Sequence, residues 1–305
     1  MDNPLASCFA DSAHYLSARV VFNRRIADRT FRIRLDCASI AAAARPGQFA
    51  MLRLADRTDP LLARPLAFYD TFRSADDVQP HGPAGERRYA DFVYLVHGKF
   101  TSALQHVAAG GEVVVWGPLG NGFSGVPDSA HLLLVAGGIG QTALLALGRE
   151  RLDRSMSGDA AVARRVTLCW GARTAAMFGG LDDFRAAGIE VHLATLDGSL
   201  GRRGAVIDLL DALPAPAAVP GETHVACCGP EAMMAAVSRW AAGRRLGCHV
   251  SLEAPMACGI GICFTCVARV RDTDAANDTN GETWDYRRTC IEGPVFEAGR
   301  IVWEA

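Results

Sequence analysis

Hydrophobic and polar residues alternate in short runs over about the first 120 residues, and turn residues separate the runs. Runs of this length, rich in β-branched and aromatic residues, predict β-strands. Six of them together predict a small antiparallel barrel, and they cover residues 17–24, 30–35, 47–54, 64–69, 92–97 and 112–116. Residues 71–90 are rich in Asp, Pro, Gly and Arg, which predicts a solvated loop or the end of a long hairpin.

Beyond about residue 124, apolar runs alternate with Ala-rich segments typical of helices. This alternation predicts βαβ units on a parallel sheet, with strands at residues 131–136, 165–170, 190–194, 223–227 and 249–252. In the last 50 residues, the runs 266–270 and 294–296 are expected to be strands that bracket the polar loop 272–282. The predicted fold class is therefore β plus α/β, with an antiparallel barrel (15–124), a parallel-sheet domain (125–252) and a small C-terminal domain (253–305).

Composition agrees with a multidomain globular protein, because 305 residues suffice for about two domains and 50% of them are hydrophobic. The formal net charge of −2 gives no reason to expect nucleic acid or an anionic membrane as a partner. The sequence has neither a cationic start followed by an apolar run nor the roughly 18 uninterrupted apolar residues of a membrane helix. We therefore predict a cytoplasmic protein.

Four of the ten cysteines follow the order C-x4-C-x2-C with a fourth cysteine further on, which is the plant-type spacing for a [2Fe-2S] cluster. Gly259 and Gly261 suit the tight loop that three converging thiolates need. Structural zinc and unligated core cysteines remain alternatives, although zinc usually takes two C-x2-C pairs or a Cys/His mixture. The predicted cluster ligands are Cys258, Cys263, Cys266 and Cys290.

A glycine turn at Gly137, Gly138 and Gly140 follows the apolar run 131–136. Such a turn lets the backbone approach a pyrophosphate, although glycines also make ordinary strand-to-helix turns. The Rossmann pattern expects an acidic ribose ligand near the end of the next strand, where this chain has Arg173 instead. An ordinary dehydrogenase is therefore disfavoured, and the choice between NAD and NADP stays open.

The order of these motifs resembles the ferredoxin reductase-like flavoprotein superfamily, and within it the electron transfer subunits of NAD-linked dihydroorotate dehydrogenase, from about Tyr15 to Phe296. The segments Pro46-Gly47-Gln48-Phe49, Arg64-Pro65-Leu66-Ala67 and Gly98-Lys99-Phe100-Thr101 resemble the family's FAD-binding barrel motifs. By that resemblance, Arg64 binds the FAD pyrophosphate, Pro65, Leu66 and Ala67 line the isoalloxazine, and Gly98, Lys99 and Thr101 form a second FAD-phosphate motif.

The second half continues the resemblance. Residues 117–123 look like the family's link into the nucleotide domain, the glycine turn would bind the NAD pyrophosphate, and Cys228, Gly229 and Pro230 are similar to the turn near the nicotinamide. Residues 253–263 and 290–296 resemble the family's cluster-binding tail.

Several positions depart from the family pattern or allow a simpler role. Ala67 stands where many relatives carry Ser or Thr, and Phe100 replaces a common glycine. Arg64 could be a surface arginine, Thr101 a helix N-cap and Cys228 a buried strand-end thiol. These alternatives leave the overall resemblance in place.

The resemblance implies an oxidoreductase subunit of pyrimidine biosynthesis that forms a hetero-oligomer with an FMN-containing dihydroorotate dehydrogenase catalytic subunit. Electrons would pass from that partner through the [2Fe-2S] cluster and FAD to NAD+, since a flavin exchanges electrons both singly and in pairs. The predicted barrel of this chain is too short to be the catalytic TIM barrel, which needs about 250 residues. No acid–base pair is expected in this chain. The alternatives are an NAD(P)H-dependent reductase component for another redox partner and a non-enzymatic cluster-binding sensor.

Overall fold

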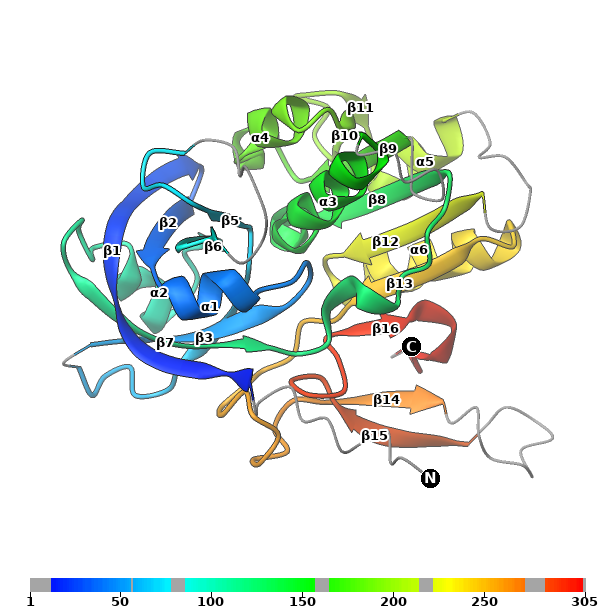
Figure 1. The fold of residues 1–305 in the computed structure, drawn as a ribbon. Coiled ribbons are helices and arrows are strands. Elements are labelled where there is room, and N and C mark those ends of the chain that lie inside the picture. The colour runs from blue at the N-terminus through cyan, green and yellow to red at the C-terminus, as the bar shows by residue number, and fades with distance from the viewer. Residues whose placement is uncertain are drawn as a thin grey trace.

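The computed structural model describes residues 12–55, 57–77, 86–156, 165–213, 222–271 and 283–303. Figure 1 shows a curled antiparallel sheet at the left, a sheet with helices at the upper right and a two-stranded hairpin below it. The predicted fold class is confirmed. No helix in these ranges is long and apolar enough to cross a membrane.

The antiparallel sheet contains seven strands within the described residues, in the order β4-β3-β7-β1-β2-β6-β5. Tyr69, between β4 and β5, donates its backbone N–H to the carbonyl of Asp91 on β6, at 2.9 Å, so the chain between β4 and β5 bridges to the far side of the sheet. The elements are β1 (His14–Ala27), β2 (Thr30–Asp36), α1 (Ala38–Ala43), β3 (Phe49–Leu54), β4 (Arg64–Ala67), β5 (Asp70–Phe72), β6 (Tyr89–Leu95), α2 (Lys99–Leu104) and β7 (Glu112–Leu119).

The six strands predicted for this sheet are present, and the structure adds β5 and α1. The segment 71–90 is the end of a hairpin, because Phe72 on β5 pairs with Tyr89 on β6. Part of that segment, 78–85, lies outside the described residues.

The second sheet also has seven strands in the described part of the chain, in the order β11-β10-β9-β8-β12-β13-β16, and it is parallel except for the pair β13–β16. Alternate residues of β8 face opposite sides: Leu134 packs with α3 and α4, and Leu133 packs with α5 and α6. Its elements are β8 (His131–Gly137), α3 (Leu145–Met156), β9 (Arg165–Ala172), α4 (Leu181–Ala186), β10 (Glu190–Thr195), β11 (Arg202–Arg203), α5 (Val206–Ala212), β12 (Thr223–Cys228), α6 (Glu231–Gly243) and β13 (Gly247–Ser251).

The C-terminal unit is built differently from its prediction. The strands that bracket the loop 272–282 are β14 (Val267–Arg271) and β15 (Trp284–Arg288), which pair with each other. The run 294–296 was expected in that place, but it overlaps β16 (Val295–Glu297), which pairs with β13 of the large sheet. The prediction was wrong because buried Val295 completes a distant sheet, whereas β15 is mostly polar and shows no apolar alternation.

Candidate cofactor and cluster site

The four predicted cluster ligands come together as two pairs. Cys258, Cys263 and Cys266 lie on the loop between β13 and β14, and Cys290 lies just after β15. Cys258 interacts with Cys263, and Cys266 with Cys290. Within the described residues, the acidic, histidine and cysteine side chains form no group of three or more around a single point. In a four-cysteine [2Fe-2S] cluster, two thiolates bind each iron, so two pairs of cysteines suit such a cluster.

The electrostatics of the cysteines favour metal binding. Hydrogen bonds with Thr265 lower the pKa of Cys263 to about 6, and a hydrogen bond with Cys290 lowers the pKa of Cys266 to about 6. The same bond and burial raise the pKa of Cys290. One thiol of each pair is therefore readily ionised, and the thiolate is the form that binds metals.

The two loop glycines have the conformations that the sequence predicted. Gly259 has φ +74° and Gly261 has φ +81°, both in the left-handed region. A Cβ atom at Gly259 would lie 2.5 Å from Met51 Cγ, so the loop also lies against the barrel at close range. Both glycines suit the conformation, and a side chain at either position would also collide with a neighbour, Met51 at Gly259 and Ile291 at Gly261.

The cysteine loop is attached to the barrel beside the predicted FAD motif. Trp116 Nε1 on β7 donates a hydrogen bond to the carbonyl of Cys258 at 3.1 Å. One apolar group joins the two units, and its buried members are Phe49, Met51, Ala63, Leu119, Met256, Cys266 and Cys290. Since Ala63 directly precedes Arg64, the cysteines and the predicted FAD strand adjoin.

The predicted FAD residues lie on β4 and at the start of α2. Arg64 is exposed at the start of β4 and donates to the carbonyl of Ala63 at 2.9 Å, and Ala67 pairs with Phe49 on β3. Gly98, with φ +82°, has nothing within 4 Å of an ideal Cβ position, so its backbone has open space beside it. An exposed guanidinium and an open glycine are groups that suit a pyrophosphate.

The structure corrects the alternative role of Thr101. The N-cap of α2 is Gly98, so Thr101 is not the cap. Its hydroxyl instead donates to the carbonyl of His97 at 2.8 Å and accepts from the His97 N–H at 2.7 Å. Lys99 is exposed and pairs with Asp59.

The predicted NAD residues form two turns that touch each other. A Cβ at Gly140 would lie 2.2 Å from the carbonyl oxygen of Cys228, and one at Gly229 would lie 2.9 Å from the backbone N of Gly137. A Cβ at Gly137 would likewise lie too close to Pro230 and Met233. Gly138–Ala143 is a 3-10 helix, and α3 begins after it, at Leu145.

These two turns lie at the topological switch point of the parallel sheet. From β8 the chain proceeds to β9 and β10 on one side, and it then returns to place β12 on the other side of β8. In open α/β sheets, ligands bind outside the carboxyl ends of strands at such a point. The geometry therefore suits a nucleotide between the turns that follow β8 and β12.

Comparisons with known proteins agree with this arrangement. Residues 253–302 match the family model of the iron-sulfur cluster binding domain of dihydroorotate dehydrogenase B. The electron transfer subunit of dihydroorotate dehydrogenase B (NAD(+)) from Bacillus caldolyticus is 33% identical over 285 residues, which cover 93% of this chain and 96% of that protein. The subunit of the same name from Clostridium acetobutylicum is 32% identical, covering 85% of this chain and 86% of that protein.

The chain belongs to this family of electron transfer subunits.

Solved structures share the family fold. A structure of NADH-dependent reduced ferredoxin-NADP oxidoreductase has a TM-score of 0.72 and 27% identity, and the match covers 94% of this chain and 90% of that chain. The ferredoxin reductase of carbazole 1,9a-dioxygenase has a TM-score of 0.59 and 21% identity, covering 77% of this chain and 67% of that chain. The latter likeness concerns the fold alone.

Within the family fold, the structure brings two further residues to the nucleotide turns. Trp170 Nε1 on β9 donates to the carbonyl of Gly138 at 2.9 Å and so braces the glycine turn. Glu253 follows β13, and partial desolvation raises its pKa. Burial, and to a lesser degree the charge of Glu253, raises the pKa of Cys228, against a hydrogen bond with Ser251. The sequence motifs contain both residues but give no sign of these contacts.

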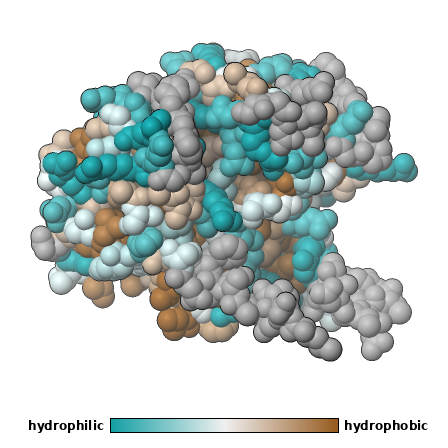
Figure 2. Space-filling model, in the orientation of Figure 1, coloured by the Kyte–Doolittle hydropathy of each residue, from teal (hydrophilic) through white to brown (hydrophobic). Residues whose placement is uncertain are grey.

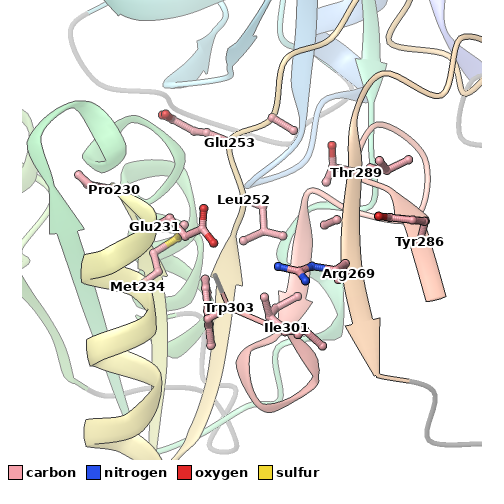
Figure 3. Close-up of a pocket in the computed structure, with 15 residues that line it drawn as sticks. Pro230, Glu231, Met234, Leu252, Glu253, Arg269, Tyr286, Thr289, Ile301 and Trp303 are labelled. Carbon is pink, nitrogen blue, oxygen red and sulfur yellow. The ribbon is translucent and has the colours of Figure 1, made fainter. Parts of the chain in front are cut away.

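A pocket of about 490 Å³ separates the nucleotide domain from the β14–β15 hairpin. Figure 3 shows Arg269 extending from β14 toward the side of the pocket that carries Glu231 at the start of α6. Pro230 and Glu253 belong to its lining, as does Thr289 beside Cys290. The pocket therefore lies between the turn at Gly229 and Pro230 and the residue that precedes Cys290.

Proposed function

We propose that this chain is the electron transfer subunit of an NAD-linked dihydroorotate dehydrogenase of pyrimidine biosynthesis. Electrons from an FMN-containing catalytic partner pass through a [2Fe-2S] cluster and FAD to NAD+. The observation that carries this proposal is the apolar group that joins Cys266 and Cys290 to Phe49, Met51 and Ala63. It supports direct contact between the cluster site and the FAD site.

When bound, FAD supplies the step between one-electron exchange with the cluster and two-electron exchange with the nicotinamide. The barrel residues hold it. Arg64 meets the pyrophosphate, and its bond to the Ala63 carbonyl limits the directions its guanidinium can take. Pro65, Leu66 and Ala67 line the isoalloxazine. The open backbone at Gly98, together with Lys99 and Thr101, makes a second contact with the FAD phosphates.

On the nucleotide side, Gly137, Gly138 and Gly140 bind the NAD pyrophosphate through their backbone. Cys228, Gly229 and Pro230 lie beside the nicotinamide. The close packing of the two turns, with Gly140 against the Cys228 carbonyl, supports this role, because a single extra methyl group would separate them. The chain's contribution is orientation, and it needs no acid–base residue of its own.

The partner binds where the cysteine loop reaches the surface. Ile262 is 73% exposed and Phe264 is 63% exposed, on either side of exposed Cys263. Figure 2 shows hydrophobic residues protruding at the lower edge of the molecule, in the position where Figure 1 draws the loop between β13 and β14. Exposed apolar groups beside a redox site suit a protein partner, because docking there shortens the path for electrons and removes apolar surface from water.

We place the functional units at residues 15–124 for FAD, 125–252 for NAD and 253–305 for the cluster, and the protein in the cytoplasm. The β13–β16 pair links the last two units. Proteolysis that releases fragments at about residues 124 and 252, each retaining its cofactor, supports these limits. Cleavage that destroys all cofactor binding at once contradicts them.

An anaerobic visible spectrum of the purified chain, with FAD and iron quantified before and after NADH, tests the function. We expect one FAD and two irons per chain, both bleached by NADH. Addition of the catalytic partner and dihydroorotate should then produce NADH from NAD+. Iron without flavin contradicts the proposal and favours the sensor alternative.

A second candidate is a reductase that serves a ferredoxin. It is favoured by the likeness to NADH-dependent reduced ferredoxin-NADP oxidoreductase over 94% of this chain. The two candidates differ in their electron partner. Reduction of a ferredoxin by NADH, together with no NADH formation from dihydroorotate in the presence of the catalytic subunit, favours the second.

A further inference from the structure

Arg288, at the end of β15, contacts the cysteine loop on both sides of Cys263. Its Nη1 donates to the carbonyl of Gly261 at 3.0 Å. Its guanidinium carbon lies 4.9 Å from the centre of the Phe264 ring. Arg288 is two residues from Cys290, so one side chain links the loop that carries three cysteines to the segment that carries the fourth.

Both loop residues that Arg288 contacts, Gly261 and Phe264, have left-handed backbone conformations. Phe264 has φ +55°, a left-handed conformation that is uncommon for an aromatic residue, and its ring is largely exposed. The backbone N–H of Gly261 forms a hydrogen bond with Cys290. By binding the carbonyl of Gly261, Arg288 therefore limits the rotation of a residue whose N–H faces a predicted ligand.

Arg288 is held in place by Glu292. The Glu292 carboxylate accepts a hydrogen bond from the Arg288 backbone N–H at 2.8 Å and lies 3.4 Å from Arg288 Nε. Its other oxygen lies 3.3 Å from Arg287 Nη1. Two guanidinium groups and one carboxylate leave one net positive charge beside the cysteines. The Arg288 side chain is only 28% exposed, so solvent screens this charge less than it would at the open surface.

We propose that Arg288 is a positioning residue for the iron-sulfur cluster, which fixes the cysteine loop and places a permanent positive charge that favours the reduced cluster. The reduced cluster carries one more negative charge than the oxidised one, and net charge and hydrogen bonds to the sulfurs set the potentials of such clusters. The inference rests on the proposed function, because it takes the four cysteines as cluster ligands.

Three variants of the holoprotein test this role: Arg288→Gln, Arg288→Lys and, as a matched control, Arg287→Gln. Arg287 shares the partner Glu292, and no contact of it with Gly261 or Phe264 is found in the described residues. The readouts are the cluster midpoint potential from an EPR-monitored titration and the rate of iron release to a chelator.

We expect Arg288→Gln to lower the equilibrium constant for cluster reduction about tenfold, which is about 59 mV for one electron, and to release iron faster. Arg288→Lys should restore most of the potential but not the iron retention, because lysine keeps the charge but loses the planar group over Phe264. Arg287→Gln should change both quantities much less.

Wild-type potential and iron release in Arg288→Gln overturn the proposal, as do equal effects of Arg287→Gln. If Arg288→Gln retains no cluster, Arg288→Lys decides, and wild-type iron release in that variant refutes the positioning role. FAD content and NADH oxidation by ferricyanide report whether each variant is folded. A wild-type chain without a [2Fe-2S] signal would instead refute the proposed function.

Discussion

Gly140→Ala is the most direct test of the nucleotide turns. The new Cβ would lie 2.2 Å from the carbonyl oxygen of Cys228, 2.4 Å from its carbonyl carbon and 2.7 Å from the backbone N of Gly229. Ordinary contacts begin at 3.4 Å, so the two turns must separate by about 1 Å. Backbone atoms make all three contacts, and no side chain can rotate away to relieve them.

The separation should affect electron transfer more than folding. Overpacking of this kind costs about 1–3 kcal/mol of stability. A displacement of about 1 Å at reacting groups can lower a rate about 100-fold. We expect NADH to reduce bound FAD about 100-fold more slowly in Gly140→Ala, while dithionite still reduces both FAD and the cluster.

Anaerobic stopped-flow measurement of flavin bleaching by NADH gives the rate. Gly243→Ala is the matched control, because an ideal Cβ there has nothing within 4 Å and the residue ends α6. That variant should keep the wild-type rate. If Gly140→Ala also keeps it, the turn after β8 does not position the nicotinamide and our assignment of the NAD site fails.

Three further predictions concern the other sites. Cys263→Ala should remove iron and inorganic sulfide but leave FAD-dependent NADH oxidation by ferricyanide, and loss of that activity too would contradict separate sites. Arg64→Ala should weaken FAD binding at least about tenfold in a fluorescence titration, since a charged hydrogen bond contributes about 1.5–3 kcal/mol; unchanged affinity would refute the assignment. Burial raises the pKa of Asp70 from 3.8 to about 6 despite Arg149 at 3.1 Å. Because the folded state holds this proton more tightly than the unfolded chain, the free energy of unfolding should fall by up to about 3 kcal/mol as the pH rises from about 4 to about 6. Asp70→Asn should remove that fall in thermal unfolding experiments, and an unchanged slope would show that another group causes it.

Local patterns were sufficient to predict most strands of both sheets. β8 and β12 are buried apolar runs, and the barrel strands are bounded by turn residues, so each can be predicted from its local sequence. β5, β11 and β15 are short or mostly polar, and they were missed because pairing partners and not composition make them strands. β16 was assigned to the wrong partner for the same reason.

The same distinction between local patterns and contacts of distant segments applies to the candidate site. The cysteine spacing and the glycine turns predicted which residues converge, since these motifs fix local backbone geometry. Contacts between distant segments could not be predicted. Trp116 and Cys258 are separated by 142 positions, and only the folded chain shows that the indole of one binds the carbonyl of the other. Arg288 was overlooked because its role depends on the loop conformation that it contacts.

Because of the position of β16, the amount of this protein in a cell should depend on the supply of iron. Val295 follows Cys290 by five positions and forms the last strand on β13. If Cys290 is a cluster ligand, as proposed, a newly synthesised chain without metal would hold it less firmly, and loosening there would free β16 and uncover the hydrogen-bonding groups of β13. Exposed strand edges invite self-association, and locally unfolded segments invite proteolysis. We therefore expect iron-starved cells to contain less of this protein, with the decrease arising after translation.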